Sequence, residues 1–113
     1  MISKADAIRV LEFRIERADK TLAKFAEDLS KDPAYAFEWG KDAVSAAATK
    51  RVCARVLGAF SKDPELSMEF VISHLQDRVI SGAHHSYRST SYLANEMARE
   101  ELAAQAELVV DFT

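Results

Sequence analysis

The sequence has few of the residues that interrupt helices or cross-link chains: three glycines, two prolines and one cysteine among 113 residues. A single cysteine, Cys53, cannot form an intramolecular disulfide, which favours a reducing compartment. The first residues do not form a signal-peptide pattern, and no apolar run reaches the roughly 18 residues that suggest a membrane-spanning helix. We therefore expect a cytoplasmic protein without a membrane segment.

The short motifs that hold common cofactors and metals are missing as well. There is no glycine-rich phosphate loop, no GxSxG elbow and no HExxH pair. The neighbouring histidines His84 and His85 would point apart on a regular backbone, and no cysteine lies close to them in sequence. We expect no metal and no cofactor.

The residues that are abundant, namely Ala, Leu, Glu, Lys and Arg, are strong helix formers. A hydrophobic fraction of 49% in a chain of this length is enough for one core. The sequence therefore predicts an all-α fold, with residues 1–113 forming a single helical domain. The expected bundle has four main helices, at about 4–29, 33–60, 64–81 and 90–110.

The helix boundaries are suggested by Ser-Lys-Asp-Pro, which occurs at 30–33 and again at 61–64. Aspartate is a good N-cap and proline fits the first helical position, so these motifs predict helices that begin at Pro33 and Pro64. The recurrence could also reflect a true duplication. Gly82 is the expected end of the third helix, because glycine readily adopts the left-handed conformation that follows many helices.

The first predicted helix carries apolar residues spaced alternately by three and four positions. Such a strict heptad pattern indicates a helix that packs lengthwise along a partner helix, either within the chain or from a second copy in a homodimer. The pattern comprises Ile8, Leu11, Ile15, Ala18, Leu22, Phe25 and Leu29.

Reactive polar residues gather between the third and fourth predicted helices, at His84, His85, Tyr87 and Arg88. An arginine, Arg78, followed after a short spacer by His-x-Tyr resembles the motif of HEPN-type ribonucleases, which are small four-helix proteins. The resemblance implies that Arg78 stabilises the charge of a scissile phosphate and that His84 or His85 acts as general acid or base. The alternative is a polar surface loop next to an ordinary surface arginine.

Two charged faces are the remaining candidates. The fourth predicted helix has an acidic face, and the second has a basic one that would suit a nucleic-acid-binding regulator. The net charge of −3 and the lack of a long basic run argue against nucleic acid as the main partner. Either face could also be an ordinary solvated surface or an electrostatic docking surface. The acidic set is Glu96, Glu100, Glu107 and Asp111; the basic set is Lys50, Arg51 and Arg55.

Four segments of the chain have a recognisable pattern: Asp-Pro-Ala-Tyr-Ala-Phe-Glu-Trp at 32–39, Arg-Ser-Thr-Ser at 88–91, Asn-Glu-Met at 95–97 and Glu-Leu-Ala-Ala at 101–104. Together they resemble small helical accessory proteins encoded by proteobacterial phages, prophages and plasmids. The resemblance implies a mobile-element protein that modulates host machinery or defence by binding, and it carries no catalytic residues.

We therefore predict a non-enzymatic protein that acts by protein–protein interaction, with a homodimer as a further possibility. Its expected contact residues are His85, Tyr87, Arg88 and the acidic set. A metal-independent HEPN-type ribonuclease is the second hypothesis, and a nucleic-acid-binding regulator is the third.

Overall fold

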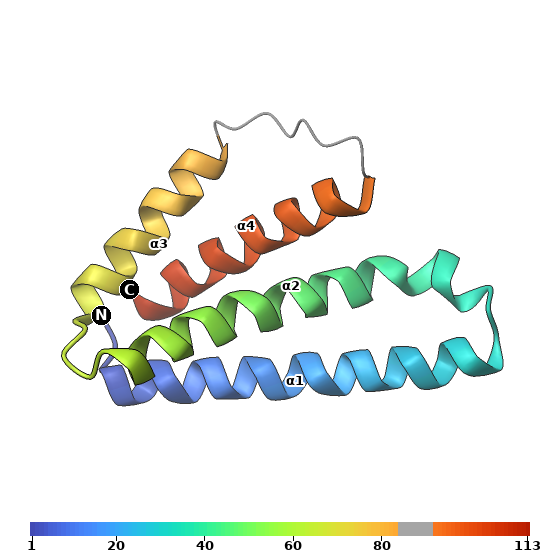
Figure 1. The fold of residues 1–113 in the computed structure, drawn as a ribbon, viewed down its shortest axis with the longest axis horizontal. Helices are drawn as coiled ribbons and strands as arrows, with labels where there is room; N and C mark the ends of the chain where they lie inside the picture. Colours follow the sequence, from blue (N-terminus) through green and yellow to red (C-terminus); the bar gives the residue numbers. More distant parts are fainter. Residues whose placement is uncertain (84–91) are drawn as a thin grey trace.

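The computed structural model describes residues 1–83 and 92–113, which contain four α-helices and no strand (Figure 1). These helices are α1 (Lys4–Lys31), α2 (Tyr35–Lys62), α3 (Met68–Ala83) and α4 (Tyr92–Phe112). The prediction of an all-α fold with four helices is confirmed. The observed bounds lie up to four residues away from the expected ones.

The helices pack in a chain of neighbours, in which α1 contacts α2, α2 contacts α4, and α4 contacts α3. Helices α1 and α2 form a long antiparallel hairpin, and α4 lies between α2 and α3 (Figure 1). The tip of the hairpin, where α1 passes into α2, extends beyond the other two helices (Figure 1). Consequently α3 reaches the rest of the bundle mainly through α4.

The heptad residues of α1 all lie on its packed side. Leu11 and Ala18 are buried and the other five are half-buried. Because α1 packs along α2, the partner helix of this pattern lies within the same chain. A second copy is not needed to cover it.

The two Asp-Pro motifs end helices rather than begin them. Asp32 and Asp63 are the C-caps of α1 and α2, and their carboxylates accept hydrogen bonds from the backbone N–H of Ala34 (3.0 Å) and of Glu65 (3.1 Å). An aspartate that bonds two residues ahead forms a local turn, which competes with helical capping. Helices α2 and α3 therefore start two and four residues later than predicted, at Tyr35 and Met68.

The second motif lies further from its helix than the first does. Helix α2 starts directly after its turn, whereas α3 starts only at Met68. There Ser67 supplies the cap, because its Oγ accepts from the N–H of Phe70 at 3.1 Å. A serine N-cap one residue before the first helical residue thus sets the true start of α3.

Gly82 does not end α3, since the helix continues to Ala83 and no glycine has a positive φ. Its role is a close helix contact instead. A Cβ built on Gly82 would lie 2.7 Å from Cδ1 of Leu102 on α4. The missing side chain therefore lets α3 and α4 approach each other at this point.

The core lies at the end of the bundle where all four helices meet. Its most deeply buried side chains are those of Leu11, Val52, Cys53, Leu108 and Phe112. The backbone N–H of Ile2 donates to the carbonyl of Phe112 at 3.0 Å, which joins the two ends of the described chain beside this core. None of the helices in the described residues combines the length and the apolar character required to cross a membrane.

Candidate functional site

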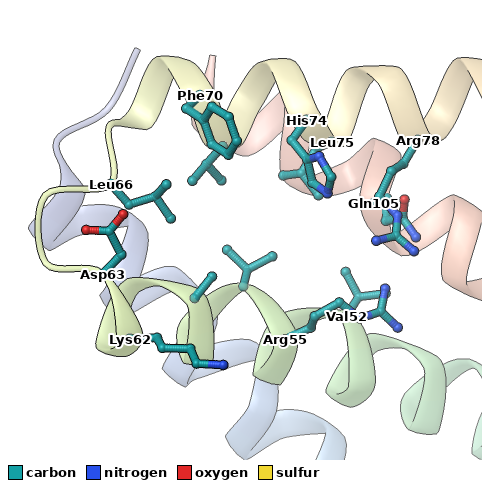
Figure 2. A pocket seen from close by; sticks show the side chains of 13 residues that line it. Val52, Arg55, Lys62, Asp63, Leu66, Phe70, His74, Leu75, Arg78 and Gln105 are labelled. Atoms are coloured by element: carbon teal, nitrogen blue, oxygen red, sulfur yellow. The ribbon is translucent and has the colours of Figure 1, made fainter.

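A groove of about 340 Å³ runs between α2 and α3, with α4 behind it (Figure 2). Most of its wall is apolar. The apolar lining consists of Val52, Val56 and Ala59 from α2, Leu66 from the connection, and Phe70, Val71 and Leu75 from α3. The volume lies near the lower end of the range of about 300–1,000 Å³ that is typical of ligand pockets.

The apolar wall arises from helical periodicity. Val52, Val56 and Ala59 follow one another at spacings of four and three on α2, and Val71 and Leu75 are four apart on α3. Residues with this spacing share one helix face, so each helix presents an apolar stripe to the groove. The residues deep in the groove, such as Val52 and Leu75, are buried, whereas Phe70 at its rim is 60% exposed.

Positively charged side chains collect around this apolar wall. Arg55 from α2 and Arg78 from α3 extend toward the same end of the groove from opposite walls, and Lys62 lies along the α2 side (Figure 2). Asp63 is the one carboxylate in the lining, and it already accepts a hydrogen bond from Glu65. The groove is therefore electropositive in a protein whose net charge is −3.

His74 also lines the groove, one helical turn before Arg78. Its ring is parallel to that of Phe70, with 6.2 Å between the ring centroids. The stacked pair forms a flat aromatic edge on the α3 wall. It offers flat contact area to a bound group.

Gln105 is the contribution of α4 to the groove. It is only 6% exposed, and its Oε1 has no hydrogen-bond partner among residues 1–83 and 92–113. A buried acceptor without a donor costs about 1–3 kcal/mol. Gln105 therefore brings a buried polar side chain, with an acceptor that can still be used, to the otherwise apolar wall.

The neighbouring Glu101 lies between two arginines of α2. One of its carboxylate oxygens is 3.6 Å from Nε of Arg51 and 3.6 Å from Nη2 of Arg55. Both distances are short enough for an ion pair but too long for a good hydrogen bond. This carboxylate oxygen therefore accepts no hydrogen bond from the described residues. Arg55 is therefore held only loosely on its own side of the groove.

Of the residues of the ribonuclease hypothesis, Arg78 lies in the groove. His84, His85 and Tyr87 lie outside the described residues, as does the predicted contact residue Arg88. The structure therefore places one member of the predicted Arg-His motif and leaves the motif itself as a prediction.

The acidic set of α4 is divided between internal contacts and surface. Arg14 of α1 donates from Nε to Oδ2 of Asp111 and from Nη1 to Glu107, each at 3.0 Å. Burial lowers the pKa of Arg14, but the bonds to Asp111 and the charges of both carboxylates outweigh it and raise the pKa overall. Two of the four residues of the acidic set thus tie α4 to α1.

The other two acidic residues are half-buried. Glu96 pairs with Arg99 of the same helix at 2.6 Å. For Glu100 no ion pair is found within the described part of the chain. A docking role for the acidic set stays a prediction.

The basic set of α2 is engaged inside the chain. Lys50 pairs with Asp19 of α1 at 2.6 Å, and Arg51 and Arg55 flank Glu101. The carboxylates reduce the charge that these side chains could offer to phosphates. Of the three, only Arg55 lines the groove.

Cys53 lies in the core, and burial raises the pKa of its thiol to about 11. The thiol is therefore protonated at neutral pH, a state in which it is a poor nucleophile. Among the described residues, no cluster of three or more His, Cys, Asp or Glu side chains could hold a metal ion.

Sequence reasoning missed the groove, because an apolar helix stripe predicts burial without showing what covers it. A signal was present in the order of residues. Arg55 and Arg78 interrupt the apolar stripes of α2 and α3, and a charged residue within such a stripe indicates a face that is not fully covered.

Comparisons of this chain with protein-family models, with curated proteins and with solved structures found no match. The geometry of the groove is the observation from which a function can be argued.

Proposed function

We propose that this protein is a non-enzymatic binding protein that docks a helix of a partner protein in the groove between α2 and α3. The observation that carries the proposal is an apolar groove with a positively charged rim on an otherwise acidic protein. Amphipathic helices commonly bind by laying their apolar face into such a groove.

The dimensions favour a partner that inserts side chains. A cavity of about 340 Å³ takes a few apolar side chains but not a whole helix, so the helix backbone would lie along the mouth. Phe70 stands exposed at that mouth and would be covered by the partner. Aromatic residues at the centre of an interface frequently carry much of the binding energy.

The cellular setting of this activity rests on the sequence resemblance. Accessory proteins of phages and plasmids act in the bacterial cytoplasm, so the expected partner is a component of host machinery or defence. The segment that contains His85, Tyr87 and Arg88 follows α3 in the chain, and it remains a predicted second contact. A homodimer also stays a prediction, which light scattering of the purified protein would test.

Two exposed residues of α3 allow a matched test. Phe70 and Ile80 are both 60% exposed, but only Phe70 lines the groove. We would replace each in turn with a photo-crosslinking phenylalanine analogue and irradiate bacterial cells that produce the protein. A discrete protein adduct is expected from position 70 and not from position 80. Equal adducts from both positions, or none from position 70, would contradict groove docking.

A HEPN-type ribonuclease is the second candidate, favoured by the position of Arg78 in the groove, where it has no ion pair with any residue that the structure describes. Its test is cleavage of single-stranded RNA by the purified protein in the presence of a chelator. A ribonuclease would lose this cleavage in Arg78→Ala and in His84→Ala or His85→Ala. The binding proposal expects no cleavage by the unaltered protein.

The nucleic-acid regulator, the third candidate, predicts DNA or RNA binding that weakens steeply with salt. That binding would be lost in Arg51→Ala/Arg55→Ala. Binding that persists in this double variant would argue against the basic set as the contact.

A further inference from the structure

We infer that the end of the groove formed by Arg55, Arg78 and Gln105 binds a carboxylate side chain of the docked helix. The partner would therefore present an acidic amphipathic helix, with Asp or Glu next to its apolar anchors. This inference rests on the proposed function and specifies the chemistry of the partner.

The two arginines are placed to share one anion. They belong to different helices and extend toward the same end of the groove from opposite sides (Figure 2). A guanidinium presents its donors as a planar fork, and a carboxylate has about four acceptor sites, so one carboxylate can accept from both side chains. Bound in this way, it would bridge α2 and α3.

Among the described residues, neither arginine makes a short ion pair. Within the described part of the chain Arg78 has no ion pair, and the carboxylate nearest Arg55 is that of Glu101 at 3.6 Å. By contrast, Arg14 makes short bonds to two carboxylates elsewhere in the molecule. Unlike Arg14, the two groove arginines therefore keep N–H donors available for a bound carboxylate.

Gln105 is a second, independent observation that supports this site. The residue is only 6% exposed, it lies next to Arg78 in the groove (Figure 2), and its Oε1 receives no hydrogen bond from the part of the chain that the structure describes. A guanidinium has five N–H donors. An Arg78 side chain that turns inward to bind a carboxylate can also donate to Oε1, which would fix its orientation and satisfy the buried acceptor.

The surroundings favour a carboxylate on a helix over a nucleic acid. The arginine end continues directly into the apolar wall of Val52, Val56 and Leu75, which a phosphate backbone could not contact favourably. A polyanion would also meet the net negative charge of the chain. On an amphipathic helix, an acidic residue three or four positions from an apolar anchor lies on the same side and reaches both parts of the groove.

The test is a selection of helical peptides from a randomised display library against the full-length protein. Enriched sequences should combine apolar residues at helical spacing with Asp or Glu at one fixed position. The consensus peptide and its Glu→Gln or Asp→Asn version are then compared by titration. The neutral version should bind about 10-fold more weakly, as expected for loss of a charge-assisted hydrogen bond.

Protein variants locate the effect. Arg78→Gln and Arg55→Gln should each weaken the acidic peptide about 10-fold and leave the neutral peptide nearly unchanged, which is the coupling that a direct pair produces. Arg51→Gln is the matched control, because Arg51 also flanks Glu101 but does not line the groove. Gln105→Leu should weaken the acidic peptide and not the neutral one. Arg78→Glu should bind a peptide with Lys at the acidic position.

The two levels of the proposal fail in different ways. Ala59→Trp fills the groove with an exposed side chain, and Ala54→Trp adds the same bulk to an exposed site outside it. If selected peptides are lost with Ala59→Trp but show no acidic preference, or are indifferent to both groove arginines, the carboxylate inference is wrong and groove docking stands. If no selected peptide distinguishes these two tryptophan variants, groove docking is wrong, and the inference with it.

Discussion

Helix α2 packs against α1 on one side and faces α3 across the groove on another. Both sides of α2 carry apolar residues, but the first is covered by a helix and the second lines a groove. Along α1 the two helices are in direct contact, and Leu11 and Ala18 of α1 are buried. Toward α3 the stripes are equally apolar, but α4 lies between the two helices and the groove stays open (Figures 1 and 2).

The charged residues differ in the same way between the two regions. On the α1 side Lys50 reaches Asp19 of the neighbouring helix at 2.6 Å. On the α3 side Arg78 has no such partner within the described residues. The apolar face of α2 toward α1 is covered by a neighbouring helix, and a lysine at its edge has an ion-pair partner there. The face toward α3 borders a groove, and the arginine at its edge has none among the described residues.

The largest expected effect separates the closed contact from the open groove. Leu11 is fully buried, whereas Phe70 is 60% exposed. Leu11→Ala should lower the free energy of unfolding by about 2–5 kcal/mol, because it leaves a cavity in the core. Phe70→Ala should lower it by less than about 1 kcal/mol but weaken binding of the selected peptides. Urea unfolding measures the free energy of unfolding of the two variants. Equal losses would show that Phe70 is packed as tightly in the groove as Leu11 is in the core.

Alkaline pH should weaken the core through Cys53. Burial raises the pKa of its thiol to about 11 in the folded protein, whereas an unfolded thiol titrates near 8.5. The protonated thiol therefore favours the folded state fully below about pH 8.5, and this contribution is lost as the pH rises toward 11. The loss amounts to about 3 kcal/mol. Subtracting the pH profile of Cys53→Ala from that of the unaltered protein isolates it, and a flat difference would contradict the burial of the thiol.

The ion pairs of Arg14 test how α4 is joined to the hairpin. Arg14→Gln should lower the free energy of unfolding by about 1–2 kcal/mol, since its side chain and that of Asp111 are about two-thirds buried. Arg9→Gln is the matched control, because the pair of Arg9 with Asp6 is largely exposed on α1. It should cost less than about 0.5 kcal/mol. Equal effects of the two substitutions in chemical denaturation would contradict a structural role for Glu107 and Asp111.

The smallest effects concern the glycines. A Cβ at Gly58 of α2 would meet no atom within 4 Å, whereas one at Gly82 would come 2.7 Å from Leu102. Gly58→Ala should stabilise the protein by about 0.5–1 kcal/mol through helix propensity. Gly82→Ala should gain less, because Leu102 must move. Thermal unfolding of the two variants compares them, and an equal gain would show that the α3–α4 contact is loose at this point.

The sequence was sufficient for the elements that depend on local periodicity. The heptad pattern of α1 predicted a lengthwise packed helix, and composition predicted the all-α class, because both follow from repeated local preferences. The ends of elements were less accurate. At Asp32 and Asp63 the same side chain can cap a helix or close a turn, and the difference in energy between these states depends on the chain around them.

The groove could not be predicted in the same way. Whether the stripes of α2 and α3 meet depends on where α4 lies, and that position results from contacts between residues far apart in sequence, such as Arg14 with Asp111. Arg78 was a candidate for another reason, its distance from the following histidines. Its place opposite Arg55 emerged only from the packing.

The double engagement of α2 also has a consequence for how the sequence can change over time. Its sides contact α1 and α4 and line the groove, so few of its positions can vary without affecting folding or binding. The outward side of α1 faces solvent instead, since Phe13 on that side is 59% exposed. Among natural relatives, α2 should therefore diverge slowest and the outward side of α1 fastest.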